Sequence, residues 1–230
     1  MQYKNLFFDL DDTIWAFSQN ARDTFEEVYD SYNFERYFDS FDHYYTIYQQ
    51  RNVELWAEYG DGKITKEELN KQRFSFPLQA VGVNDESLAE RYSNDFFAII
   101  PTKSTLMPHA KEVLEYLSPK YNLYILSNGF RELQSQKMHS GGVAEYFKKV
   151  ILSDDLGILK PWPEIFHFAL SATQSELRDS LMIGDSWEAD ITGANGVGMN
   201  QVFYNPAGRT ELPFSPTYQI DDLRDLINLL

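Results

Sequence analysis

From about residue 110 to the end, short apolar strands alternate with amphipathic helices, and this alternation limits the possible folds more than any other feature of the sequence. The pattern predicts helices over 110–117, 131–138, 164–172, 188–195 and 221–230, and strands over 123–126, 150–152, 180–183 and 200–204. A chain that returns to a strand after each helix forms a parallel sheet with helices on both faces. We therefore predict an α/β fold with a three-layer α/β/α core.

One further strand, over residues 6–8, is separated from this region by a long block without strand signals. Between residues 16 and 100, aromatic and aliphatic residues recur at helical spacing. The first strand has the apolar character of a buried parallel strand, so we assign it to the same sheet. The helical block is then an insertion. The predicted domains are residues 1–15 with 105–230 for the core, and 16–104 for an all-α insert.

Composition excludes several classes of function. The 230 residues include 20 basic and 35 acidic ones, and the net charge of −15 argues against a nucleic-acid polymer or an anionic membrane as partner. The absence of cysteine excludes disulfides, thiolate catalysis and sulfur-ligated zinc. No targeting signal is visible, and no apolar run approaches the roughly 20 residues of a membrane span. We expect a cytoplasmic protein, as a monomer or a small homo-oligomer.

The first strand delivers carboxylates to its end, because residues 6–8 are followed by Asp9, Leu10, Asp11, Asp12 and Thr13. Side chains alternate along an extended chain, so the first and third of these five would point to the same side. Such a pair could share a metal ion or a phosphoryl group. The alternative is an acidic turn in which Asp12 and Thr13 cap a helix.

Polar residues also follow later elements, and ligands of an open parallel sheet bind beyond the carboxyl ends of its strands. Ser127-Asn128-Gly129 offers a hydroxyl, an amide and backbone N–H groups at a helix start, which suits a phosphate. Lys160 stands before Pro161 at the next helix. The alternatives are a plain turn for the first motif and a solvated side chain for the lysine.

A second pair of carboxylates follows the strand over 180–183. Asp185 comes directly after Gly184, and Asp190 lies about one helical turn further on. Magnesium prefers hard oxygen ligands, and Asp9 and Asp185 with one backbone carbonyl would suffice. The alternative role for Asp185 is to cap the helix that follows.

The four motifs follow one another along the chain as Asp-x-Asp, Ser-Asn-Gly, Lys-Pro and Gly-Asp-x4-Asp. In these motifs and in their order, the sequence resembles the haloacid-dehalogenase-like (HAD) hydrolase superfamily. The resemblance covers essentially the whole chain. It implies a Rossmann-like three-layer core with a parallel sheet. It also implies that the helical insert is a cap domain, which covers the site and selects substrates.

The same resemblance assigns roles. Asp9 would be the nucleophile, and Asp11 the general acid and then the general base. Mg²⁺ would be held by the Asp9 carboxylate, the Asp11 carbonyl and the Asp185 carboxylate. The residues implied to bind the phosphoryl oxygens are Ser127, Asn128 and Lys160. Those implied to support the site are Thr13 and Asp190, the latter by holding metal-bound water or the lysine.

The presence of Asp11 favours a phosphatase, since dehalogenases of the superfamily lack this second carboxylate. Three segments resemble the branch that contains pyrimidine nucleoside 5′-monophosphatases. Two lie in the insert, Leu55-Trp56-x2-Tyr59-x2-Gly62-x-Ile64-Thr65 and Arg73-Phe74, and one lies in the core, Ser127-Asn128-Gly129-Phe130-x2-Leu133-Gln134. We expect a magnesium-dependent phosphatase acting on a small phosphorylated metabolite, a nucleoside 5′-monophosphate, through an aspartyl-phosphate. A sugar-phosphate phosphatase or phosphoglucomutase-like enzyme would share the four motifs. A non-catalytic phosphometabolite-binding protein would keep them without turnover.

Overall fold

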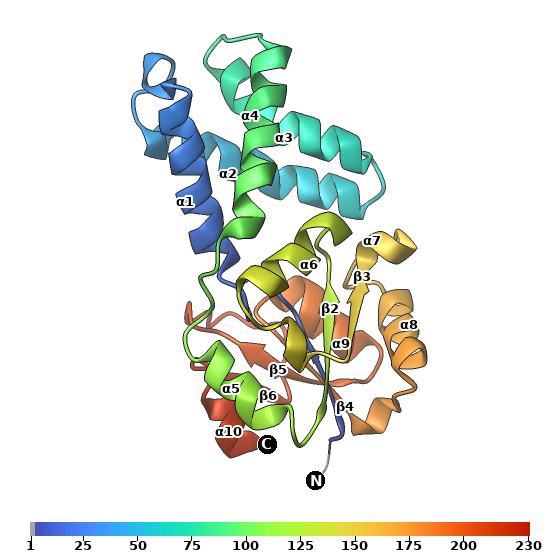
Figure 1. Ribbon diagram of the computed structural model, residues 1–230. Helices are drawn as coiled ribbons and strands as arrows, with labels where there is room; N and C mark the ends of the chain where they lie inside the picture. The colour runs from blue at the N-terminus through green and yellow to red at the C-terminus, as the bar shows by residue number, and fades with distance from the viewer. Residues whose placement is uncertain (1–2) are drawn as a thin grey trace. The chain divides into compact units, whose positions relative to one another are not determined.

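The structure, a computed structural model, describes residues 3–230, which divide into two units (Figure 1). The core unit contains the chain up to Ser18 together with Lys103–Leu230, and the helical unit contains Gln19–Thr102. The first strand of the core unit is thus separated from the remaining strands by the whole of the helical unit.

A six-stranded sheet forms the centre of the core unit, and every pair of neighbouring strands is parallel. Its order is β3-β2-β1-β4-β5-β6. The strands are β1 (Asn5–Phe8), β2 (Asn122–Ser127), β3 (Lys149–Leu152), β4 (Ser180–Gly184), β5 (Asn200–Tyr204) and β6 (Tyr218–Ile220). Successive strands run outward from β1 to β3, and the chain then returns to the other side of β1. The order therefore reverses at the centre of the sheet, where open α/β sheets form their ligand crevice.

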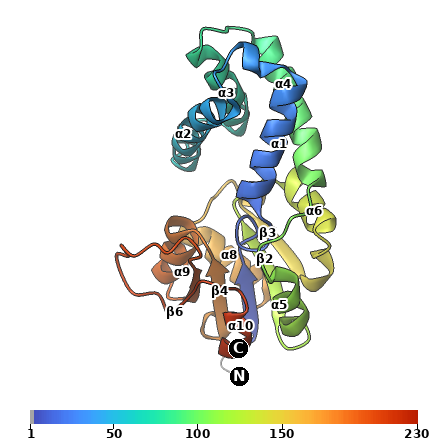
Figure 2. The same ribbon diagram turned by 90° about the vertical axis from the view of Figure 1, so that its left-hand side faces the viewer.

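Helices cover both faces of this sheet (Figure 2). On one side lie α5 (Ala110–Leu117) and α6 (Arg131–Ser140), and on the other lie α8 (Pro163–Thr173) and α9 (Thr192–Gly196). The side of α8 and α9 is packed by one apolar cluster, which includes Phe7, Tyr124, Met182, Phe166 and Ala194. Because side chains alternate along each strand, Phe7 and its register partners Tyr124 and Met182 all reach this one face.

The fold agrees with the predicted alternation except in three places. The short strand β6 was not expected; it is three residues long and lies at the sheet edge, too short to leave a clear pattern in the sequence. A four-residue helix, α7 (Ser153–Leu156), directly follows β3 and was also unexpected. The closing helix, α10, covers only Asp225–Leu229, because the residues before it form turns.

The predicted helix over 188–195 begins as a π-helical turn, Trp187–Ile191, before α9. The N–H of Ile191 reaches the carbonyl of Ser186, five residues earlier, at 3.3 Å. Such wide turns are rare in proteins overall, but those that occur are often at functional sites. Asp190 lies within this turn.

The helical unit holds α2 (Phe41–Gly60), α3 (Lys66–Ala80), α4 (Glu86–Ile99) and most of α1 (Phe17–Ser31). Side-chain oxygens of Ser40, Thr65 and Asp85 accept backbone N–H groups at the starts of α2, α3 and α4. Thr65 and Glu68 complete a capping box. The sequence therefore encodes these helix starts locally.

Aromatic rings fill the interior of the helical unit. Phe25 of α1 is fully buried, and the centroid of its ring lies 4.2 Å from those of Tyr48 and Phe96. Tyr92 donates a hydrogen bond to the Phe25 carbonyl at 3.2 Å. Most of the aromatic stripe in the insert is thus explained by packing.

The two connections between the units leave from one place in the core unit. The N–H of Met107 donates to the Ile14 carbonyl at 2.9 Å, and the N–H of Ala16 donates to the Thr105 carbonyl at 3.1 Å. Trp15 and Leu106 form an antiparallel bridge between these hydrogen bonds. Among the described residues, none of the helices combines the length and apolar surface needed to cross a membrane.

The packing around Phe25 gives a prediction. We expect Phe25→Ala to lower the free energy of unfolding of the helical unit by about 3–5 kcal/mol, because it leaves a cavity among rings that cannot close it. Urea unfolding followed by circular dichroism measures this. Val53→Ala on α2 is the control, since Val53 is 70% exposed. Equal effects of the two substitutions would contradict the assignment of Phe25 as the centre of this core.

Candidate active site

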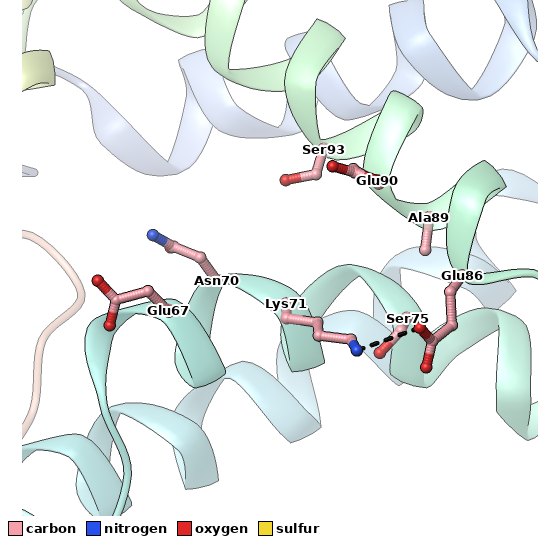
Figure 3. Close-up of a pocket in the computed structure, with 8 residues that line it drawn as sticks. All are labelled: Glu67, Asn70, Lys71, Ser75, Glu86, Ala89, Glu90 and Ser93. Carbon is pink, nitrogen blue, oxygen red and sulfur yellow. Dashed lines mark hydrogen bonds and ion pairs between the residues drawn. The ribbon is translucent and has the colours of Figure 1, made fainter.

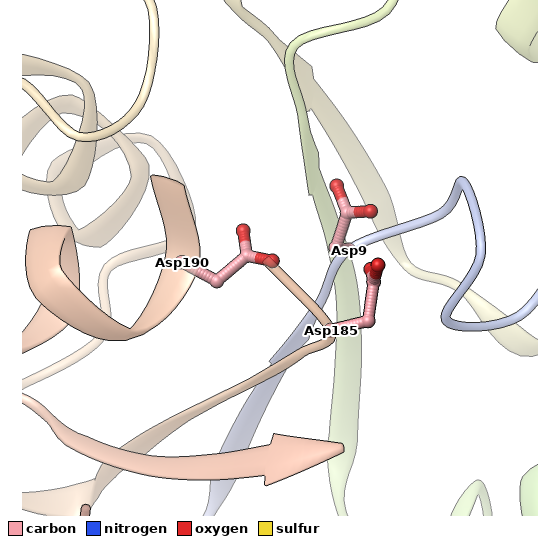
Figure 4. Close-up of side chains that lie close together, drawn as sticks. All are labelled: Asp9, Asp185 and Asp190. Carbon is pink, nitrogen blue, oxygen red and sulfur yellow. The ribbon is translucent and has the colours of Figure 1, made fainter. Parts of the chain in front are cut away.

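The ends of the central strands bring three carboxylates together, as Figure 4 shows. Asp9 follows β1, Asp185 follows β4, and Asp190 comes from the π-helical turn. The N–H of Asp9 donates to the Ile183 carbonyl of β4 at 2.9 Å, which fixes the start of the loop after β1 against its neighbour. The site therefore lies where the strand order reverses.

Lys160, in the loop before α8, connects two of these carboxylates, those of Asp9 and Asp190. Its Nζ lies 2.6 Å from Asp9 Oδ1, 2.6 Å from Asp190 Oδ1 and 2.7 Å from the Leu126 carbonyl oxygen. An ammonium group has three N–H donors, and all three are used. Burial would lower the pKa of Lys160, but the contacts with Asp190 and Asp9 outweigh it and raise this pKa above its usual value. The solvated lysine considered as an alternative is excluded, because only 2% of the side chain is exposed.

Asp190 is fully buried and both of its oxygens are engaged. Oδ1 accepts from Lys160, and Oδ2 accepts from the N–H of Ser186 at 3.1 Å. Gly184 makes this possible, because a Cβ at that position would lie within the space of the Asp190 side chain, 2.7 Å from its Cβ. The glycine of the Gly-Asp motif is thus required by close approach rather than by turn geometry.

Asp185 is held by Thr13. Thr13 Oγ1 donates to Asp185 Oδ1 at 2.9 Å and accepts from the Asp185 N–H at 3.1 Å. Burial, followed by repulsion from Asp190, raises the pKa of Asp185 to about 7. Burial likewise raises the pKa of Asp9 well above its usual value, although the charge of Lys160 works against this.

These carboxylates fit a hard divalent cation. Asp9, Asp185 and Asp190 each offer an oxygen, and the three ligand atoms lie within 4.8 Å of one another. One buried ammonium does not balance the carboxylates gathered here, and a cation would offset the remaining charge. Since both Asp190 oxygens already accept hydrogen bonds, Asp9 and Asp185 are the better donors. This choice matches magnesium's need for few carboxylates and several waters.

The residues after Asp9 leave the extended conformation. Asp12 has a positive φ of 59°, and its carboxylate accepts from the N–H and the hydroxyl of Ser18 in the first turn of α1. The alternative of an acidic turn that caps a helix is therefore correct for Asp12. Thr13 does not cap the helix with its side chain, which is hydrogen-bonded to Asp185. Strand alternation is not what orients Asp11, because β1 ends at Phe8.

Asp11 is instead bound by side chains of α6. Lys137 Nζ lies 2.8 Å from Asp11 Oδ1 and 3.1 Å from Oδ2, and Gln134 Nε2 donates to Oδ2 at 3.0 Å. Gln134 belongs to the motif that resembles the pyrimidine nucleotidases but was not predicted to be a site residue, and Lys137 was not predicted at all. The available signal was a pair of polar residues, three apart, on the inward side of a helix.

Ser127 is the last residue of β2, and Asn128 follows it. Ser127 Oγ accepts from Gln134 Nε2 at 2.7 Å and from the Gly129 N–H at 3.1 Å. The side-chain amide of Asn128 forms two hydrogen bonds with the main chain of Lys160. Its Nδ2 donates to the Lys160 carbonyl at 3.0 Å, and its Oδ1 accepts from the Lys160 N–H at 2.8 Å. The plain turn considered as an alternative does not account for these contacts.

A groove of about 370 Å³ lies between α3 and α4 of the helical unit (Figure 3). The residues that line it are Glu67, Asn70, Lys71, Ser75, Glu86, Ala89, Glu90 and Ser93. Three of these are acidic and one is basic, and the lysine is paired with Glu86 at 3.2 Å. None of the residues of the four motifs lines this groove, so the carboxylate–lysine cluster of the core unit remains the candidate.

Comparison with known proteins decides the family. Residues 3–198 match the family model described as haloacid dehalogenase-like hydrolase. The chain belongs to this family. The matched segment includes every residue that the four motifs contribute, from Asp9 to Asp190.

Three relatives match over almost their full lengths. HAD-hydrolase YfnB of Bacillus subtilis is 30% identical over 232 residues, covering 100% of this chain and 96% of that protein. Pyrimidine 5′-nucleotidase YjjG of Escherichia coli is 29% identical over 235 residues, covering 100% and 99%. Pyrimidine 5′-nucleotidase PynA of Streptococcus pneumoniae is 31% identical over 236 residues, covering 100% and 96%.

The crystal structure of YfnB bound to magnesium is also similar to this HAD-like hydrolase. The TM-score is 0.90 at 27% identity, covering 100% of this chain and 99% of that one. The predictions of a HAD-like hydrolase, of a Rossmann-like parallel α/β core and of a relationship to pyrimidine 5′-nucleotidases are confirmed.

The close approach at Gly184 is testable. We expect Gly184→Ala to lower the free energy of unfolding by about 1–3 kcal/mol, because the added methyl group displaces the buried Asp190 carboxylate. Guanidinium unfolding measures the change. Gly196→Ala in α9 is the matched control, since a Cβ there meets nothing within 4 Å. If the two variants are equally stable, Gly184 is not required by the position of Asp190.

Proposed function

We propose that this HAD-like phosphoric monoester hydrolase cleaves nucleoside 5′-monophosphates with the help of Mg²⁺ and through an aspartyl-phosphate on Asp9. The observation that carries the proposal is the setting of the Asp9 carboxylate at the central strand ends. Lys160 holds one of its oxygens at 2.6 Å, and Asp185 stands beside it. The nucleotidase activity is inferred from the printed names of YjjG and PynA.

Asp9 acts as the nucleophile in this proposal. Because Lys160 fixes Oδ1, the carboxylate has a defined orientation, and we assign the attack on phosphorus to Oδ2. In the first step a bond forms from this oxygen to phosphorus while the bond from phosphorus to the ester oxygen breaks. Asp11 gives its proton to the departing alcohol.

The second step releases the enzyme. Asp11, now a carboxylate, takes a proton from a water molecule as the water oxygen attacks phosphorus. The bond between phosphorus and Asp9 breaks, and inorganic phosphate leaves. Asp11 is then protonated again and Asp9 is a free carboxylate, so the cycle closes.

Ser127 is prepared to donate to a phosphoryl oxygen. Its Oγ already accepts two hydrogen bonds, from Gln134 and from the Gly129 N–H, so both lone pairs are occupied. The hydroxyl hydrogen is what remains for a ligand, and only an acceptor can use it. We propose that Asn128 contributes by holding the Lys160 loop through its side chain, which leaves its backbone N–H for the phosphate.

The Asp9 and Asp185 carboxylates and the Asp11 carbonyl would hold Mg²⁺, which neutralises charge on the carboxylates and on the phosphoryl group. Thr13 and Asp190 support the residues that contact the ligand. Thr13 orients Asp185, and Asp190 fixes Lys160. The insert, residues 16–104, is proposed to be the cap domain that selects the substrate. YfnB supports both points, since its structure is described as magnesium-bound and as revealing interdomain movement.

Replacing the nucleophile tests the mechanism. We expect Asp9→Asn to reduce turnover of 4-nitrophenyl phosphate by about 10³-fold or more, because an amide oxygen cannot form the phosphoenzyme. Circular dichroism confirms that the variant is folded. Asp221→Asn, at an exposed position, is the control. Persistent turnover by the folded Asp9 variant would reject the mechanism.

Metal removal and a substrate panel test the rest of the proposal. Chelation should abolish phosphate release, and added Mg²⁺ should restore it.

Uridine or thymidine monophosphate should give a higher kcat/KM than hexose phosphates. The opposite preference would indicate a sugar-phosphate phosphatase, and tight binding without hydrolysis would indicate a phosphometabolite-binding protein.

A further inference from the structure

Helix α6 carries a buried lysine that the proposed reaction has not yet used. The side chain of Lys137 is 3% exposed, and its Nζ contacts both oxygens of Asp11, at 2.8 and 3.1 Å. The Asp11 side chain keeps 26% exposure. The lysine therefore lies on the protein side of the carboxylate and leaves the other side open to a ligand.

Aromatic rings hold this ammonium group in place. Lys137 Nζ lies 4.9 Å from the ring centroids of Trp15 and of Phe17. Trp15 is itself fully buried, and its indole N–H donates to the Lys103 carbonyl at 3.2 Å. An ammonium ion that lies over two neighbouring rings is attracted to both and has less freedom than a surface lysine. Its contact with Asp11 is thus rigidly placed.

Gln134, one helical turn before Lys137, contacts the same carboxylate. Its Nε2 donates to Asp11 Oδ2 and to Ser127 Oγ, at 3.0 and 2.7 Å. A carboxylate only accepts hydrogen bonds, so the amide nitrogen must face Asp11. Gly129 leaves room for this amide, because a Cβ there would lie 2.9 Å from Gln134 Cγ and closer still to the amide atoms.

The two oxygens of Asp11 are consequently not equivalent. Oδ2 accepts from both Gln134 and Lys137, whereas Oδ1 accepts one hydrogen bond among the described residues, from Lys137. An ionised carboxylate oxygen has two lone-pair sites. Oδ1 therefore retains one site, and Oδ2 retains none.

We propose that Lys137 is a positioning residue for proton transfer, which holds Asp11 so that Oδ1 carries the proton to the leaving oxygen. The inference rests on the proposed phosphatase mechanism and adds to it the residue that orients the acid. An external anchor is needed here because Asp11 follows the end of β1 and precedes a residue with positive φ, so no strand fixes its side chain. Misplacing a reacting group by about 1 Å can cost about 100-fold in rate.

The test compares leaving groups. The 4-nitrophenolate ion leaves without needing a proton, whereas phenolate is a much poorer leaving group and depends on the acid. In Lys137→Met, we expect kcat/KM for phenyl phosphate to fall about 10- to 100-fold, while that for 4-nitrophenyl phosphate changes little. The ratio of the two kcat/KM values does not depend on how much of the enzyme is folded. Gln136→Met, an exposed position on the same helix, is the matched control and should leave the ratio unchanged.

Two results would overturn the inference. Equal losses on both substrates would show that Lys137 supports the whole site rather than the acid, and unchanged kinetics would show that Asp11 does not depend on it. Asp11→Asn, measured in parallel, separates this from the proposed function. If Asp11→Asn keeps its activity on phenyl phosphate, the acid role of Asp11 itself is wrong. If only Asp11→Asn becomes selective for the nitrophenyl ester, the mechanism stands and the role of Lys137 falls.

Discussion

The structure of the site depends on one buried ammonium group. Lys160 lies in the loop before α8. Its contacts reach the residue after β1, the π-helical turn after β4 and the carbonyl of Leu126 near the end of β2. Burying several carboxylates at strand ends is unfavourable unless positive charge accompanies them. Lys160 supplies part of this charge from within the fold. The net carboxylate charge that remains makes the site suitable for a divalent cation.

The main features of this arrangement could be predicted from the sequence, because each depends on local signals. Apolar runs predicted the central strands, and the rule that parallel strands end at one edge predicted that Asp9, Ser127 and Asp185 would lie near one another. The resemblance to HAD hydrolases added the expected roles of these residues. The starts of α3 and α4 also rest on local sequence, since Thr65 and Asp85 are typical N-cap residues.

What could not be predicted depends on tertiary contacts. Gln134 and Lys137 look like the polar positions of an ordinary surface helix, and only the placement of α6 against the end of β1 turns them toward Asp11. The π-helical turn at Asp190 has no sequence signal, because the same residues would suit a regular helix. The contact of the Asn128 side chain with Lys160 crosses 32 residues and follows from the packing of two loops. Each of these features supports a residue that was predicted.

The antiparallel contact between residues 14–16 and 105–107 has a consequence for how the chain folds. Pairing β1 with β2 across an unfolded insert would require closing a loop of more than a hundred residues, and the contact of Trp15 with Leu106 itself closes one of roughly ninety. The helices between them contact mostly their sequence neighbours and can form early. Once Trp15 and Leu106 meet, the intervening segment is reduced to a closed side branch. The first strand then reaches its partner as though the two were nearly consecutive in the chain.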